Sequence, residues 1–168
     1  MIETDLEVQV GEWLRRLGFK LVVAESCTGG LIGHRLTNVP GSSDYYLGSI
    51  IAYAYEAKER LLGVDHQTLL QFGAVSQEVV TAMARGARLA LAGEFPLDRL
   101  IGLSVTGIAG PGGGMPGKPV GLVWIGLSTP DGDYAWHYVW QSDRLGNKEH
   151  SAHQALRLVL DYLQEQPL

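Results

Sequence analysis

The stretch KLVVAESCTGGLIGHRLT, residues 20–37, carries the clearest local prediction of secondary structure in this chain. It opens with Lys20 to Ala24, a short apolar run with β-branched residues, which is typical of a buried strand. The run breaks into hydroxyl groups and glycines, and Leu31 to Thr37 then resumes a helical spacing of apolar residues. The stretch therefore predicts a strand, a tight turn and a helix, in that order.

Strand and helix patterns continue on both sides of this stretch. The other predicted helices cover residues 4–17, 56–62, 65–72, 76–93 and 145–164. The other predicted strands cover residues 49–54, 100–105, 120–128 and 134–140, with a hairpin signal at 129–133 between the last two. This alternation predicts an α/β fold, a three-layer α/β/α sandwich on a mixed, mostly parallel sheet with one antiparallel hairpin.

Composition and charge exclude several classes of protein. The 168 residues suit a single domain over 1–168, and 46% hydrophobic with 18% charged residues indicates a soluble globular protein. The net charge of −5 argues against non-specific binding of nucleic acid. No apolar stretch approaches about 18 residues, so no membrane span is predicted. The single cysteine, Cys27, cannot form an internal disulfide, and we expect a cytoplasmic protein.

Glycine is unusually frequent, and it gathers in one loop. Ten of the 22 glycines lie between Gly102 and Gly132, and residues 106–119 have too few side chains to form a core of their own. We predict a functional loop or a mobile lid there. The loop also matches the glycine and lysine spacing of a phosphate-binding P-loop, but Pro119 stands where that motif needs serine or threonine. We therefore reject that match.

The turn after the first predicted strand is the strongest candidate for chemistry. Ser26 and Thr28 lie with Gly29 and Gly30 at the start of a helix, where unpaired N–H groups favour an oxyanion or a phosphate. The alternative is that a hydroxyl of this turn only caps the helix. Cys27 could act as a nucleophile, although a small buried cysteine is the commoner outcome.

Further candidates lie elsewhere in the chain. Lys58 is either part of a solvated helix face or a buried base that accepts a proton from Ser26. Thr106 and Gly107, at the end of a predicted strand, could line the same cleft edge. Arg144 is either a surface residue or an anion clamp. The histidine pair at 150 and 153 lacks a third ligand, so no metal site is predicted.

Several motifs occur together in one order. They are Ala-Glu-Ser-Cys-Thr-Gly-Gly at 24–30, Gly-Ser-Ser at 41–43, Tyr-x-x-Glu-Ala-Lys at 53–58 followed by Leu-Leu-Gly-Val, Gly-Ala-Val-Ser at 73–76, and Thr-Gly-Ile-Ala-Gly-Pro at 106–111. In this combination the chain resembles the CinA C-terminal domain family in its stand-alone form, from about Glu3 to Leu163. Active members of that family are nicotinamide mononucleotide amidases.

The resemblance implies a function and a set of roles. The reaction is a metal-independent deamidation of nicotinamide mononucleotide to nicotinate mononucleotide and ammonia, with no cofactor. By position, Ser26 matches the nucleophile, Lys58 the general base, and Tyr53 the tyrosine that supports the Ser/Lys dyad. The N–H groups near Thr28, Gly29 and Gly30 would stabilise the oxyanion. The candidates for holding ribose or phosphate are Thr106, Gly107 and Arg144. The family also suggests a homodimer or a higher homo-oligomer.

Two departures from the family pattern bear on function. Many relatives have Tyr-Ser-Asn-Glu-Ala-Lys, whereas this chain has Ala54 and Tyr55 in the middle. The second arginine that often follows Arg144 by four residues is Lys148 here, which keeps the charge and loses the bidentate fork. Two alternative functions follow. One is a catalytically weak nucleotide-binding or interaction module, and the other is an amidase for another small carboxamide.

Overall fold

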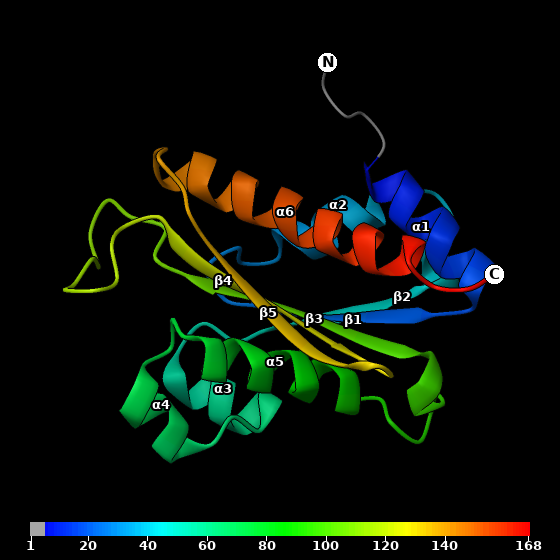
Figure 1. The fold of residues 1–168 in the computed structure, drawn as a ribbon, viewed down its shortest axis with the longest axis horizontal. Helices are drawn as coiled ribbons and strands as arrows, with labels where there is room; N and C mark the ends of the chain where they lie inside the picture. The colour runs from blue at the N-terminus through cyan, green and yellow to red at the C-terminus, as the bar shows by residue number, and fades with distance from the viewer. Residues whose placement is uncertain (1–5) are drawn as a thin grey trace.

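A five-stranded sheet is the middle layer of the computed structural model, which describes residues 6–168 (Figure 1). Its strands are β1 (Lys20–Glu25), β2 (Tyr46–Ile51), β3 (Leu100–Gly107), β4 (Leu122–Thr129) and β5 (Gly132–Val139). Their order across the sheet is β2-β1-β3-β4-β5. Strand β1, which was predicted from residues 20–24, therefore lies between two other strands of the sheet. A continuous apolar run is expected at such a position.

The sheet is mixed, as predicted. Strand β1 pairs in parallel with both β2 and β3, whereas β4 is antiparallel to both β3 and β5. Four strands therefore run in one direction, and only β4 runs against them. The hairpin between β4 and β5 is confirmed, and the long glycine-rich loop makes the other antiparallel connection, from β3 to β4.

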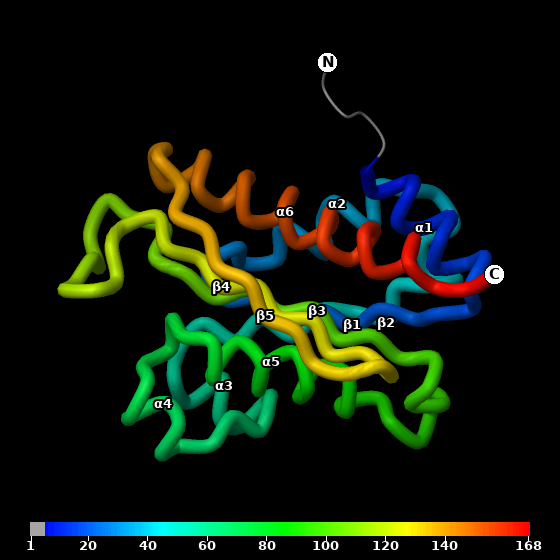
Figure 2. Tube along the Cα trace, in the orientation of Figure 1, coloured from blue at the N-terminus to red at the C-terminus, as the bar shows by residue number. Residues whose placement is uncertain are grey.

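Helices cover both faces of the sheet. The helices α1 (Leu6–Leu17), α2 (Leu31–Thr37) and α6 (Arg144–Gln164) lie on one face, and α3 (Tyr55–Leu62), α4 (His66–Phe72) and α5 (Gln77–Leu89) lie on the other (Figure 1). The three-layer α/β/α architecture is thus confirmed. Figure 2 shows that the glycine-rich loop, residues 108–121, extends beyond the sheet at the end where α6 begins.

The alternation of side chains along β1 explains its apolar sequence. Leu21 and Val23 belong to the larger core cluster, with α1 and α6, while Val22 and Ala24 belong to the smaller cluster beneath α5. Because helices cover both faces of the sheet, the side chains on both sides of β1 are removed from water. Burial of that apolar surface, at about 25 cal/mol per Å², is what holds the layers together.

Some predicted boundaries differ from the structure. The predicted strand 49–54 instead spans Tyr46–Ile51. The Ala52 N–H still donates to the Glu25 carbonyl at the end of β1, and the chain then turns into α3 at Tyr55. The predicted helix 76–93 ends at Leu89. Positions 4 and 5 of the first predicted helix lie outside the described residues. Within the described part of the chain, no helix is long and apolar enough to span a membrane.

Candidate active site

Ser26 lies at the edge of the sheet where the parallel strands end. It directly follows β1, and its N–H donates to the Val105 carbonyl in β3 at 3.0 Å. Alternation along β1 turns Ser26 toward the layer that contains α3. The carboxyl edge of parallel strands is the usual position of ligand sites in α/β folds. Ser26 is 6% exposed, so it is screened from water by its surroundings.

Lys58 reaches Ser26 from α3. Its Nζ lies 2.9 Å from the Ser26 Oγ, and it donates to the carbonyl oxygens of Ala52 at 3.0 Å and Tyr53 at 2.8 Å. Lys58 is 1% exposed, so the alternative of a solvated helix face is wrong. In the neutral amine the two carbonyls occupy both N–H groups. The nitrogen lone pair then faces the Ser26 hydroxyl, which is the arrangement that proton transfer needs.

Burial also changes the acidity of Lys58. The loss of water around the ammonium group lowers the pKa of Lys58 from 10.5 to about 8. An appreciable fraction of the side chain is therefore neutral near physiological pH, in contrast to a surface lysine. The geometry and this pKa together allow Lys58 to accept a proton at mild pH.

Glu25 is a site residue that the sequence analysis missed. Its buried carboxylate accepts hydrogen bonds from the Thr28 hydroxyl at 2.8 Å and from the N–H groups of Gly30 at 3.2 Å, Ile32 at 2.9 Å and Gly33 at 3.1 Å. The carboxylate thus takes up the free donors at the start of α2 and fixes the turn that carries Ser26. The sequence signal that could have identified Glu25 is an acidic residue just before a turn with glycines and a helix.

This arrangement changes the set of oxyanion donors. The Gly29 N–H donates to the Ser26 carbonyl at 3.1 Å, and the Gly30 N–H is taken by Glu25. The prediction that these two amides face an oxyanion therefore needs correction. Within residues 6–168 the Thr28 N–H has no backbone acceptor and the Cys27 N–H contacts only its own thiol, so these two are the donors that remain.

Removing the Glu25 carboxylate is expected to destabilise the fold. In Glu25→Ala the four donors at this turn lose their acceptor, and each buried unpaired donor costs about 1–3 kcal/mol. We expect a loss of at least about 3 kcal/mol in the free energy of unfolding, measured by urea titration. The free energy of unfolding of Glu25→Gln, which keeps one acceptor oxygen, should lie between those of the wild type and Glu25→Ala.

The matched control for this prediction is Glu12→Ala, which removes an exposed glutamate from α1. It should change the free energy of unfolding by no more than about 0.5 kcal/mol. Equal urea midpoints for Glu25→Ala and Glu12→Ala would show that the buried carboxylate does not hold the turn.

Cys27 lies beside the candidate nucleophile and has a different character. Burial raises the pKa of its thiol to about 12. The thiol is therefore protonated at neutral pH, and a protonated thiol is a poor nucleophile. The structure favours the alternative in which Cys27 is a packed, unreactive side chain.

Tyr53 and Arg144 meet at the mouth of the site. The Tyr53 carbonyl accepts from Lys58, whereas its phenol is exposed and accepts from the Arg144 Nη2 at 3.3 Å. Arg144 also donates through Nη1 to the Gly110 carbonyl at 2.6 Å. Tyr53 thus contacts Lys58 through its main chain, and Arg144 connects Tyr53 to the glycine-rich loop.

Thr106 and Gly107 lie at the end of β3, near Ser26. The Thr106 hydroxyl is buried and donates to the Ala74 carbonyl at 2.9 Å, so its proton is used within the protein. Gly107 is required by close packing, because a β-carbon there would lie 2.9 Å from the Leu122 carbonyl oxygen in β4. Both residues shape the edge of the site through packing.

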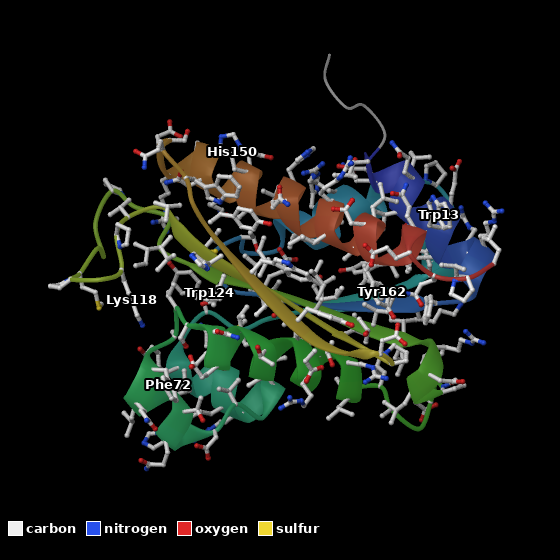
Figure 3. All side chains as sticks on the ribbon, in the orientation of Figure 1. Trp13, Phe72, Lys118, Trp124, His150 and Tyr162 are labelled. Carbon is white, nitrogen blue, oxygen red and sulfur yellow. The ribbon has the colours of Figure 1, made fainter. Side chains whose placement is uncertain are left out.

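The Tyr55 phenol contacts the same residue, Ala74, as the Thr106 hydroxyl. The phenol accepts from the Ala74 N–H at 3.2 Å, at the segment between α4 and α5. That same segment receives the glycine-rich loop, since Lys118 donates to the Phe72 carbonyl at the end of α4. Figure 3 shows Lys118 on the loop above Phe72. The departure at Tyr55 therefore adds a contact to the segment that also holds Thr106.

The described residues give no sign of a metal centre. Within residues 6–168, no group of three or more histidine, cysteine, aspartate or glutamate side chains is arranged to hold a metal ion. Lys148, in the second turn of α6, lies close to Gly29 on the Ser26 turn. The arrangement as a whole is a serine beside a buried lysine, with two open backbone N–H groups and cations nearby.

Comparison with known proteins identifies relatives of this chain. The family model of the CinA C-terminal domain matches residues 3–163. A CinA-like protein of Salinibacter ruber is 49% identical over 154 residues, covering 92% of this chain and 36% of that protein. A putative competence-damage inducible protein of Moorella thermoacetica is 52% identical over 125 residues, covering 74% of this chain and 29% of that protein. This chain thus spans about a third of the length of these relatives.

Solved structures share the fold over nearly their whole length. The competence damage-inducible protein A of Klebsiella pneumoniae is 31% identical, with a TM-score of 0.88 over 96% of this chain and 97% of that one. A competence/damage inducible protein of Agrobacterium tumefaciens is 34% identical, with a TM-score of 0.82 over 98% and 99% of the two chains.

Proposed function

Because this chain belongs to the CinA C-terminal domain family, we propose that it hydrolyses the carboxamide of nicotinamide mononucleotide to nicotinate mononucleotide and ammonia. The reaction uses Ser26 and Lys58 and needs no metal ion. The observation that carries the proposal is the 2.9 Å contact between the Lys58 Nζ and the Ser26 Oγ, with Lys58 almost completely buried. A serine needs such a base to become a nucleophile, and a buried lysine can supply it.

The first half of the reaction forms an acyl-enzyme. Neutral Lys58 takes the Ser26 proton while the Ser26 Oγ attacks the carboxamide carbon, and the carbonyl oxygen becomes an oxyanion. The N–H groups of Cys27 and Thr28 stabilise that charge. As the C–N bond breaks, the protonated Lys58 returns its proton to the departing nitrogen, and ammonia leaves.

The second half releases the acid. Lys58, neutral again, takes a proton from a water molecule, whose oxygen attacks the acyl carbon. The Ser26 Oγ leaves and recovers its proton from Lys58, which yields the nicotinate product and the free enzyme. Only one base is needed for both halves, because each half returns the lysine to its neutral form.

The nucleotide part of the substrate lies along the end of β3 and the start of α6 in this proposal. Gly107 and the neighbouring Thr106 form the wall on the ribose side, with Arg144 at the mouth. The partner is therefore a small nucleotide. A homodimer or a higher homo-oligomer remains a prediction from the family resemblance.

The test is ammonia release from nicotinamide mononucleotide by the purified protein in EDTA. We expect turnover that the chelator does not reduce. Turnover that EDTA abolishes would contradict a metal-independent reaction. A panel of other small carboxamides is measured in parallel, and preference for one of them would make the protein an amidase of different specificity. Thermal stabilisation by the nucleotide without any ammonia release would instead indicate a binding module.

A further inference from the structure

A second cavity lies far from Ser26, between the hairpin of β4 and β5 and the last turns of α6. Its volume is about 410 Å³. Figure 1 shows this hairpin and the glycine-rich loop at opposite ends of β4. The 21 residues of α6 separate the cavity from Arg144 by about 30 Å, at 1.5 Å per residue. The cavity is therefore distinct from the proposed active site.

Aromatic rings form one wall of this cavity. Tyr134 and Trp136 are two residues apart on β5 and so lie on the same face, with ring centroids 6.0 Å apart and planes inclined by 20°. Tyr162 of α6, labelled in Figure 3, lies with its ring 6.4 Å from that of Tyr134 and inclined by 46°. Trp136 packs against the core, whereas Tyr134 is 41% exposed. The rings thus offer a firm aromatic surface that the protein itself leaves partly uncovered.

Acidic side chains complete the lining. They are Asp131, Asp161 and Glu165, and in the described part of the chain no lysine or arginine lines the cavity. Asp161 is paired with the Arg157 Nε at 3.1 Å. Asp131 accepts the hydroxyl of Tyr162 at 2.7 Å, which is a neutral donor. Among the described residues, no side chain pairs with the Glu165 carboxylate. Two negative charges beside the rings therefore lack a positive partner.

The fold holds these charges in place. Tyr162 is 8% exposed, and burial raises the pKa of its phenol to about 12. The phenol therefore keeps its proton and donates it to the Asp131 Oδ2, which leaves Oδ1 for another donor. Glu165 is the C-cap residue of α6, where the unpaired carbonyls of the helix end add partial negative charge. Both features favour a cation.

The chemistry of the lining narrows the kind of cation. Within residues 6–168 the acidic groups are not arranged to hold a metal ion. The volume instead lies in the range of about 300–1,000 Å³ that is typical of sites for small organic molecules. A guanidinium group is planar, stacks on aromatic faces and donates hydrogen bonds to carboxylates in a fixed fork. A quaternary ammonium could stack on the rings but has no N–H group for the carboxylates.

We propose that this cavity binds a small organic cation with a guanidinium head. The head stacks on Tyr134 and Trp136 and donates to Asp131 and Glu165, and the apolar remainder of the molecule lies over Leu158 on α6. The proposal goes beyond the amidase reaction and does not depend on it, because the binding site shares no residue with the Ser26 site.

The test is calorimetric titration of the whole chain with butylguanidinium and with butylurea, its neutral isostere. We expect saturable binding of butylguanidinium at one site, with the Kd for butylurea at least about tenfold higher, because only the guanidinium makes charge-assisted hydrogen bonds. Equal affinities, or no saturable binding of butylguanidinium, would overturn the proposal. Tighter binding of N-acetylarginine amide than of butylguanidinium would also overturn the assignment to a small molecule, and would indicate an arginine of a protein partner.

Variants locate the binding site. Asp131→Asn keeps an acceptor for Tyr162 but removes the charge, and Tyr134→Leu removes an exposed ring. Each should raise the Kd for butylguanidinium at least about fivefold. The matched control is Glu149→Gln, an exposed residue near the other end of α6, which should leave the Kd within about twofold. Unchanged Kd values in both Asp131→Asn and Tyr134→Leu, with melting temperatures like that of the wild type, would refute this site. The result is independent of ammonia release, so failure of the proposed amidase reaction would leave the test intact.

Discussion

Ser26→Ala is expected to reduce ammonia release from nicotinamide mononucleotide by at least about a thousandfold. The variant removes the attacking oxygen, and losses of this size or larger follow the removal of a catalytic serine. The small side chain fits the same space, and the Ser26 N–H to Val105 contact is kept, so the fold should be unchanged. Steady-state assays and the urea midpoint of the same preparation measure the two effects.

The control for Ser26 is Ser43→Ala, which changes an exposed serine in the short turn at Ser42–Asp44. It should retain wild-type turnover. Full activity in Ser26→Ala would contradict the proposed nucleophile. Loss of activity in both variants would indicate a defect that is not specific to the site.

Lys58→Met is expected to cause a loss of similar size, for a different reason. Methionine keeps the length and apolar character of the side chain but has no basic nitrogen, so Ser26 keeps its proton. Lys58→Arg should not rescue activity, because a guanidinium stays protonated at any pH used in the assay. Turnover in Lys58→Arg near the wild-type level would contradict a role as base.

The pH dependence of the wild type provides an independent test of the same role. Only the neutral amine can accept the Ser26 proton, and the pKa of Lys58 is lowered to about 8. We therefore expect kcat/KM to rise about tenfold per pH unit below pH 8 and to level off above it. A profile that falls as the pH rises through 8 would show that the protonated form is the active one.

The buried lysine makes the active site a source of instability. The pKa of Lys58 lies near 8 in the folded chain, against an ordinary value of 10.5, and the difference corresponds to about 3 kcal/mol of the free energy of unfolding. Between pH 8 and pH 10.5 the unfolded chain binds more protons than the folded chain, because its Lys58 is still protonated. The cost is therefore fully present below pH 8 and disappears as the pH rises toward 10.5. Such a cost is expected where a reactive group is buried for function.

Local sequence patterns were sufficient to predict the three-layer architecture. The strand and helix on either side of the Ser26 turn, and the hairpin between β4 and β5, follow from spacing and turn residues within short windows. Prediction from such a short window succeeds because the face on which each side chain lies is set by its own strand or helix, with a period of 2 or 3.6 residues. Boundaries were less secure, as β2 shows, because its pairing with β1 begins at Tyr46 and the chain enters α3 at Tyr55.

The sequence by itself determined the three-layer fold, the turn that carries Ser26 and the candidate residues of the site. Only the tertiary structure decided that Lys58 is buried, although Glu59 and Arg60 beside it suggested a solvated helix. It also decided that Glu25 holds the turn and that Lys148 lies over Gly29. Periodicity places a side chain on a face of its own element. What covers that face depends on segments far away in the chain, and the electrostatics of the site follow from that covering.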